Sequence, residues 1–151
     1  MPVQTTYSQT LSPGKAGAIA NAEPKTLISR VVETAEGIMF GKPVTQGTAD
    51  IACRAMQADD TRILGITVRD QSVPPEASDR FAENTNALIM TSGVIWVEAA
   101  TTVSAGDDVW VTVADGSFTN IDAGGGATLQ IAGARWDTSA TSGNLAKLRL
   151  A

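Results

Sequence analysis

The sequence predicts an all-β protein: a single compact β-sandwich or small barrel, jelly-roll-like, with an extended N-terminal arm. Two observations carry this prediction. Short apolar runs rich in β-branched residues recur about every 8–12 residues. Gly, Pro, Asp and Asn separate these runs, as turn residues do between strands. The pattern is not the alternation of strands and helices that is typical of βαβ units. At 151 residues, the chain has the size of one domain.

Residues 1–26 differ from the rest and are predicted to form the arm, with the β domain at 27–151. The segment is polar, broken by prolines and poor in large apolar side chains, so it buries too little surface to fold alone. Two interpretations stay open. It is either a terminus without fixed structure, or an arm that becomes ordered on a neighbouring subunit, with Tyr7, Leu11 and Ile19 as contacts.

The β domain is expected to hold about eight to ten strands at regular spacing. The expected strands lie at residues 26–33, 37–44, 51–57, 62–70, 87–99, 108–114, 117–121, 128–136 and 145–150. A polar loop is expected from Pro74 to about Asn86. The run 87–99 is either two strands or one bulged strand, with the break near Ser92-Gly93.

The run 108–114 shows the clearest alternation. Val109, Val111 and Val113 are expected to face one side, and Trp110 and Thr112 the other. Asp115-Gly116 then predicts a tight hairpin back into residues 117–121.

No residue pattern points to catalysis. The chain contains no histidine, which removes the commonest general base and metal ligand. The pairs Asp59-Asp60 and Asp107-Asp108 favour turn positions, where Asp bonds nearby backbone. A calcium site is the alternative, but the spaced acidic loop pattern is missing. Cys53 lies among apolar neighbours and is expected to be a buried, inert thiol. We therefore expect no enzyme, cofactor or metal.

Trp96, Trp110 and Trp136 are the three tryptophans, each on an expected strand. Tryptophan supplies large buried area, so packing in the core or at an oligomer interface is the main interpretation. A sugar-binding platform of stacked rings is the alternative.

The charge pattern argues against several partners. The formal net charge is −5, and the lysines and arginines are scattered. Nucleic-acid binders normally carry a basic patch, and anionic membranes attract basic segments, so neither partner is expected. The N-terminus lacks the charged and apolar regions of a signal peptide, and no apolar run is long enough to span a membrane. We expect a soluble protein that is made and used in a reducing compartment.

Several segments, in order, resemble the tailed-phage structural cement (capsid decoration) protein family. They are GAIANAEPKT at 17–26, IMFGKPVTQG at 38–47, GITV at 65–68, GVIWV at 93–97, AGDDVWV at 105–111, GARW at 133–136 and the tail at 139–150. This resemblance implies a non-enzymatic virion structural protein on the capsid exterior. Such proteins bind the outer surface of the head and cement neighbouring major capsid protein subunits. They usually act as small homo-oligomers, here a dimer or trimer.

Other functions remain open from the residues alone. Another virion β-protein, from a tail, baseplate or fibre, would share this composition. A carbohydrate-binding module would use the tryptophans. An enzyme without histidine is the third alternative.

Overall fold

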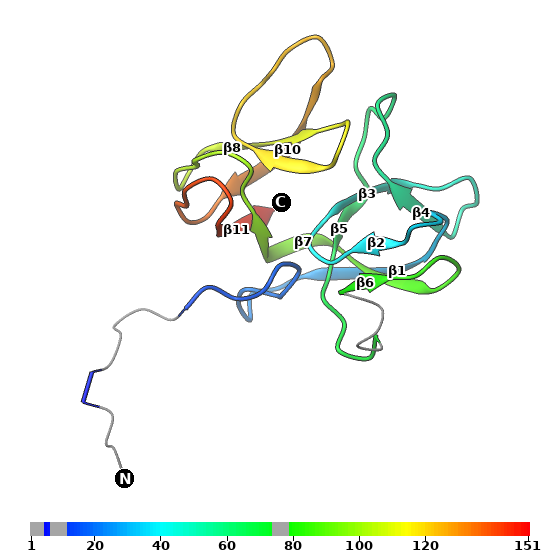
Figure 1. Ribbon diagram of the computed structural model, residues 1–151, viewed down its shortest axis with the longest axis horizontal. Coiled ribbons are helices and arrows are strands. Elements are labelled where there is room, and N and C mark those ends of the chain that lie inside the picture. Colours follow the sequence, from blue (N-terminus) through cyan, green and yellow to red (C-terminus); the bar gives the residue numbers. More distant parts are fainter. Residues whose placement is uncertain (1–4, 7–11, 74–78) are drawn as a thin grey trace.

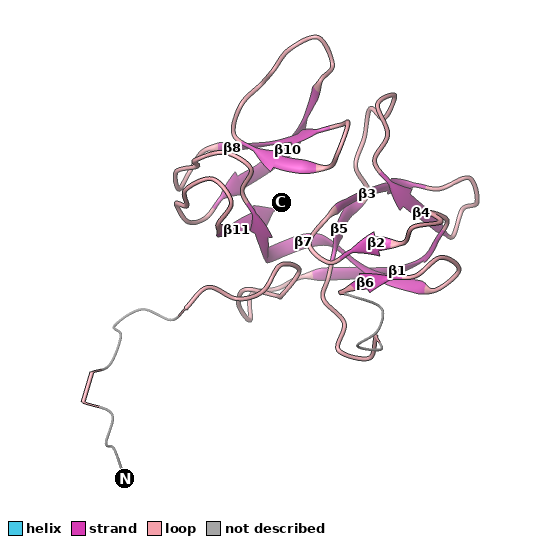
Figure 2. Ribbon diagram, viewed as in Figure 1, coloured by secondary structure: helices cyan, strands magenta, loops and turns pink. Residues whose placement is uncertain are grey.

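The computed structural model describes residues 5–6, 12–73 and 79–151. Within these residues every regular element is a β-strand, which confirms the all-β prediction (Figure 2). The strands are β1 (Thr26–Val32), β2 (Ile38–Met39), β3 (Pro43–Gln46), β4 (Ala52–Ala55), β5 (Gly65–Thr67), β6 (Arg80–Phe81), β7 (Asn86–Glu98), β8 (Asp108–Thr112), β9 (Ser117–Thr119), β10 (Thr128–Trp136) and β11 (Leu145–Leu150).

The N-terminal half is a small closed barrel. Its strands follow the order β1-β4-β3-β5-β7, and β1 also pairs with β7, which closes the ring (Figure 1). β1 and β4 run parallel, whereas the other neighbours in the barrel are antiparallel, so the barrel is mixed. The small-barrel form of the prediction is therefore confirmed. Closure leaves no free edge in this ring for unwanted pairing.

The C-terminal half is an antiparallel sheet in the order β7-β11-β10-β8-β9. The sheet curls, because Phe118 on β9 forms a bridge with Ala99, which directly follows β7. The expected hairpin joins β8 to β9, with Thr112 opposite Ser117 and Gly116 in the left-handed region at φ 66°. Glycine suits this turn because it adopts positive φ without steric cost.

β7 joins the two halves. Its first part pairs with β1 and β5, and residues 93–98 pair with β11. Thr26 lies opposite Ser92 while Leu27 lies opposite Met90, which leaves Thr91 as the extra residue of a β-bulge. The run predicted as two strands or one bulged strand is thus one bulged strand. A bulge increases bending and twist, and here it turns one strand from the barrel into the second sheet.

Two clusters of buried side chains fill the halves. The barrel cluster includes Cys53, Ile89 and the edge-to-face rings of Phe40 and Phe81, whose centroids are 5.0 Å apart. The larger cluster lies between the second sheet and the barrel. It includes all three valines that alternation placed on one face of β8, and also Trp136 and Leu148.

Two expectations about elements are wrong. The single strand expected at 37–44 is divided into β2 and β3, because Gly41 turns the chain at φ 72° and its backbone approaches Gly17. The loop expected from Pro74 to Asn86 contains β6, whose Phe81 pairs with Ile38. One buried aromatic in a polar segment does not show the period of a strand, so the sequence pattern missed it.

Candidate functional site

The predicted arm is fixed to the β body at residues 14–20, here called the arm root. The Gly17 N–H donates to the Trp96 carbonyl at 2.8 Å, and the Trp96 N–H donates to the Ala18 carbonyl at 2.9 Å. The Ala20 N–H donates to Val94, and Ile19 bridges Ile95 in antiparallel register. The root therefore lies like an added strand along the side of β7 that β11 leaves free.

Side chains also hold the root. Gly14 lies so close to the indole of Trp96 that a Cβ on Gly14 would stand 2.6 Å from Cδ1 of that ring. On β11, the Lys147 Nζ lies 5.4 Å from the ring centroid of Trp96, within the range of a cation–π contact. The half-buried Trp96 is thus contacted by the arm root and by β11.

Two arginines form ion pairs beside the root. Arg149 on β11 donates to both carboxylate oxygens of Glu23 and, at 3.2 Å, to Asp137. The hydrogen bond from Arg149 holds the pKa of Glu23 below its usual range. Arg69 donates to the Ala16 carbonyl and pairs with Asp79 at 2.6 Å. These contacts attach residues 16 and 23 to two different parts of the body.

The structure locates some of the predicted contact residues. Tyr7 and Leu11 lie outside the described residues. Ile19 lies in the arm root with 37% of its surface exposed. Trp136 is buried in the larger core cluster, whereas Trp96 and Trp110 are half-buried on β7 and β8. Whether any of these residues contacts a partner stays a prediction.

Sequence reasoning missed the attachment of the root to β7. A short run of Gly, Ala and a lone Ile has too little alternation to predict a strand. The glycine that lies on Trp96 gives no signal of its own, because its role depends on a ring 82 positions later in the chain.

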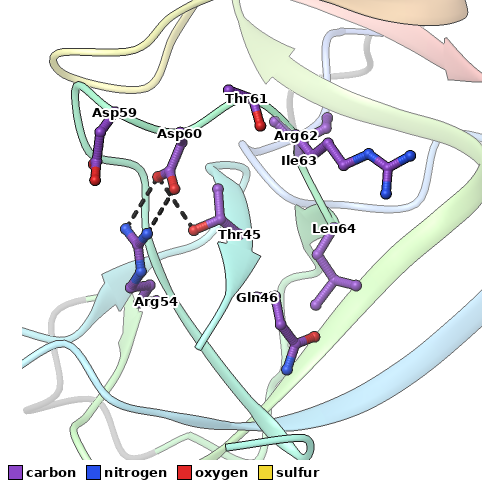
Figure 3. Close-up of a pocket in the computed structure, with 9 residues that line it drawn as sticks. All are labelled: Thr45, Gln46, Arg54, Asp59, Asp60, Thr61, Arg62, Ile63 and Leu64. Carbon is purple, nitrogen blue, oxygen red and sulfur yellow. Dashed lines mark hydrogen bonds and ion pairs between the residues drawn. The ribbon is translucent and has the colours of Figure 1, made fainter. Parts of the chain in front are cut away.

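A separate cleft of about 450 Å³ opens on the barrel beside β3 and β4 (Figure 3). Arg54 pairs with both oxygens of Asp60 at 2.6 and 3.0 Å, and Asp60 also accepts from Thr45 and from the Gln57 N–H. This network ties the 57–60 turn to the barrel strands, so Asp60 is the turn residue that the sequence predicted. Arg62 points away from the pair.

Asp107 and Cys53, the other candidate groups, have surroundings that indicate a structural role. Asp107 accepts from the Ser104 N–H and from Asn120, and these bonds lower its pKa. Cys53 is buried, as predicted, and this burial raises the pKa of its thiol to about 11. The described residues contain no group of three or more side chains suited to a metal, and they contain no helix long and apolar enough to cross a membrane.

Solved structures share the fold of this chain. The chain is 20% identical to a protein of the capsid of Myoviridae phage XM1, with a TM-score of 0.74, covering 99% of this chain and 98% of that one. It is 14% identical to the N base of the head fiber gp8.5 of bacteriophage phi29, with a TM-score of 0.54, covering 83% and 95%. No curated protein is significantly similar in sequence.

The family follows from the sequence match. Residues 3–151 match the structural cement protein family (E217 gp24/Pam3 gp6), and the chain belongs to this family. It is therefore a non-enzymatic structural component of a phage capsid.

Proposed function

We propose that this cement protein binds the outer surface of the head through its N-terminal arm and bridges neighbouring major capsid protein subunits. The observation that carries the proposal is the fixed arm root. Main-chain bonds to Val94 and Trp96 hold residues 17–20 on β7, and Ser12 and Pro13 just before the root are exposed. A fixed root reduces the entropy that the preceding residues lose when they bind a neighbour.

The apolar contacts of the arm are assigned to Tyr7, Leu11 and Ile19. Residues 1–14 contain no acidic or basic side chain, so the arm can lie on a protein surface without desolvating a charged group there. Extended segments of this kind bind through main-chain bonds and a few side-chain anchors. The same weak contact repeated over a shell supplies avidity.

The test is a truncation that spares the root. Removing residues 2–11 keeps Gly14 and the bonds to β7, so the protein should still fold and should lose its occupancy on heads that lack the cement protein. A truncation through residue 20 would be ambiguous, because it would also expose the β7 edge. Binding of the 2–11 truncation at full occupancy would reject the arm as the contact.

We also propose that the protein acts as a homo-oligomer, a dimer or trimer. Capsid shells repeat local symmetry axes, and a closed oligomer matches such an axis with identical contacts. Sedimentation of the purified chain, free and released from heads, tests this directly. A monomer in both samples would contradict the proposal.

A further inference from the structure

The turn between β3 and β4, residues 47–51, is here called the barrel tip. It lies at the end of the barrel that points away from the second sheet (Figure 1). Residues 48–51 are exposed, and among them only Asp50 is charged. In the described part of the chain, Ile51 is the large apolar side chain with the greatest exposure, 66% of its surface. The barrel tip therefore presents an apolar side chain to the outside.

Hydrogen bonds fix the main chain of the barrel tip. The carboxylate of Glu33, which follows β1, accepts from the Thr48 N–H at 2.8 Å and from the Ala49 N–H at 3.2 Å. The side-chain amide of Gln46 donates to the Ala49 carbonyl at 2.8 Å and to the Asp50 carbonyl at 3.1 Å. Two side chains from the ends of β1 and β3 thus hold three consecutive residues of the turn.

The main chain around Ile51 is fixed as well. Its carbonyl accepts from the Val31 N–H on β1 at 2.9 Å, and the following Ala52 pairs with Val31 in parallel register. The side chain of Ile51 is β-branched, so few rotamers are open to it. An exposed apolar side chain on a fixed turn loses little conformational freedom on binding, so more of its burial energy remains as affinity.

We propose that Ile51 is an anchor that inserts into an apolar depression on the outer surface of the major capsid protein. This proposal rests on the proposed function, to which it adds a second contact. A protein that bridges subunits needs attachments at two separate places. The arm root provides one along β7, and the barrel tip, at the far end of the barrel, provides the other (Figure 1). Two weak contacts engaged together bind far more tightly than either alone.

A second copy of the chain is the other partner to consider. A groove of about 240 Å³ lies between the barrel and the β8–β9 hairpin, and its lining includes Met39, Pro43 and Met56. Pro43 begins β3 and Met56 directly follows β4, so this groove lies at the opposite end of the same hairpin from the barrel tip. A contact between tip and groove joins two different surfaces and would arrange copies end to end instead of around a symmetry axis. The capsid protein is therefore the favoured partner.

The experiment compares two variants of the full chain for binding to heads that lack it. Threonine and valine have the same branched shape, but threonine has a hydroxyl where valine has a methyl group. Ile51→Thr should weaken binding about tenfold, because the apolar contact of the anchor is lost, whereas Ile51→Val should weaken it only about threefold. Neither variant should change the unfolding midpoint noticeably, because the side chain is exposed. The difference between the two variants therefore measures the apolar contact.

Ile121→Thr is the matched control. Ile121 has the same side chain at a comparable exposure, 53%, but it lies in the loop between β9 and β10 in the second sheet. The same substitution at that position should leave head binding as it is in the unmodified protein.

Three outcomes would overturn the proposal. One is equal binding by Ile51→Thr and Ile51→Val, and another is an equal loss of binding with Ile121→Thr. The third is a change in the sedimentation of the purified chain with Ile51→Thr in the absence of heads, which would place the barrel tip between two copies. The 2–11 truncation leaves the tip intact. Loss of binding by that truncation with normal binding of Ile51→Thr would reject the anchor and keep the arm contact, and the converse result would reject the arm contact and keep the anchor.

Discussion

Gly14 lies against the indole of Trp96, and no side chain fits between them. A Cβ at Gly14 would stand 2.6 Å from Cδ1 and 2.8 Å from Nε1 of that ring. Because the bonds from β7 to residues 17–20 begin three positions later, this contact fixes where the arm leaves the body.

We predict that Gly14→Val separates the root from Trp96. The added side chain cannot fit without a shift of the ring or the backbone, and such overpacking costs about 1–3 kcal/mol. The indole should become more exposed, seen as a red shift of its fluorescence, and a protease should cleave faster near residues 14–20. Ser12→Val changes an exposed neighbour and should leave both signals as they are. Unchanged cleavage in Gly14→Val would contradict the assigned role of the contact.

The second prediction concerns the pair Arg54–Asp60. Asp60→Ala removes the acceptor of the Arg54 guanidinium and of the Gln57 N–H. Loss of hydrogen bonds to a charged group with little exposure should lower the free energy of unfolding by about 1–3 kcal/mol in a denaturant titration. Asp59→Ala is the control, because Asp59 is exposed, and it should change the free energy by less than about 0.5 kcal/mol. Equal losses of unfolding free energy in the two variants would show that the Arg54–Asp60 pair does not stabilise the fold.

The third prediction is a dependence of stability on pH. Glu33 accepts from the Thr48 N–H, the Thr48 hydroxyl and the Ala49 N–H, and these bonds lower its pKa. A lowered pKa in the folded state stabilises the fold above the usual Glu value of about 4.3, and this contribution is lost as pH falls through the lowered value.

Unfolding midpoints at pH 7 and pH 3 test this dependence. Glu33→Gln should be less stable than the unmodified protein at pH 7, and the difference should narrow at pH 3. Glu83→Gln changes an exposed glutamate in the 82–85 turn and should show no such narrowing. A constant difference for Glu33→Gln at both pH values would contradict the prediction.

The fourth prediction concerns the thiol of Cys53. Because the side chain is fully buried and its pKa is raised to about 11, a thiol reagent at pH 8 should react only when the barrel opens. The labelling rate should therefore rise with denaturant in parallel with unfolding. Rapid labelling of the folded protein, at the rate of a free thiol, would show that the barrel opens readily.

Much of the β domain was predictable because alternation reports directly on burial. The runs at 128–136 and 145–150 coincide with β10 and β11, and the alternation of Val109, Val111 and Val113 correctly marks the buried face of β8. Period-two burial is a local property, so it can be recognised within one strand. The ordered family resemblance correctly indicated a capsid cement protein.

Contacts between residues that are distant in the chain could not be predicted from the sequence, because they depend on the tertiary structure. The sequence alone supports a strand at 87–99 with a break near Gly93. It does not show that this strand closes a barrel and then pairs with β11. The sequence also marks residues 1–26 as unlike the rest. It does not show that residues 17–20 bond to β7 or that Gly14 contacts Trp96. Those relationships depend on strand order and register, which are set by packing of the whole core. Local composition determined the β-strands and the polar arm, whereas long-range packing decided where the arm is attached.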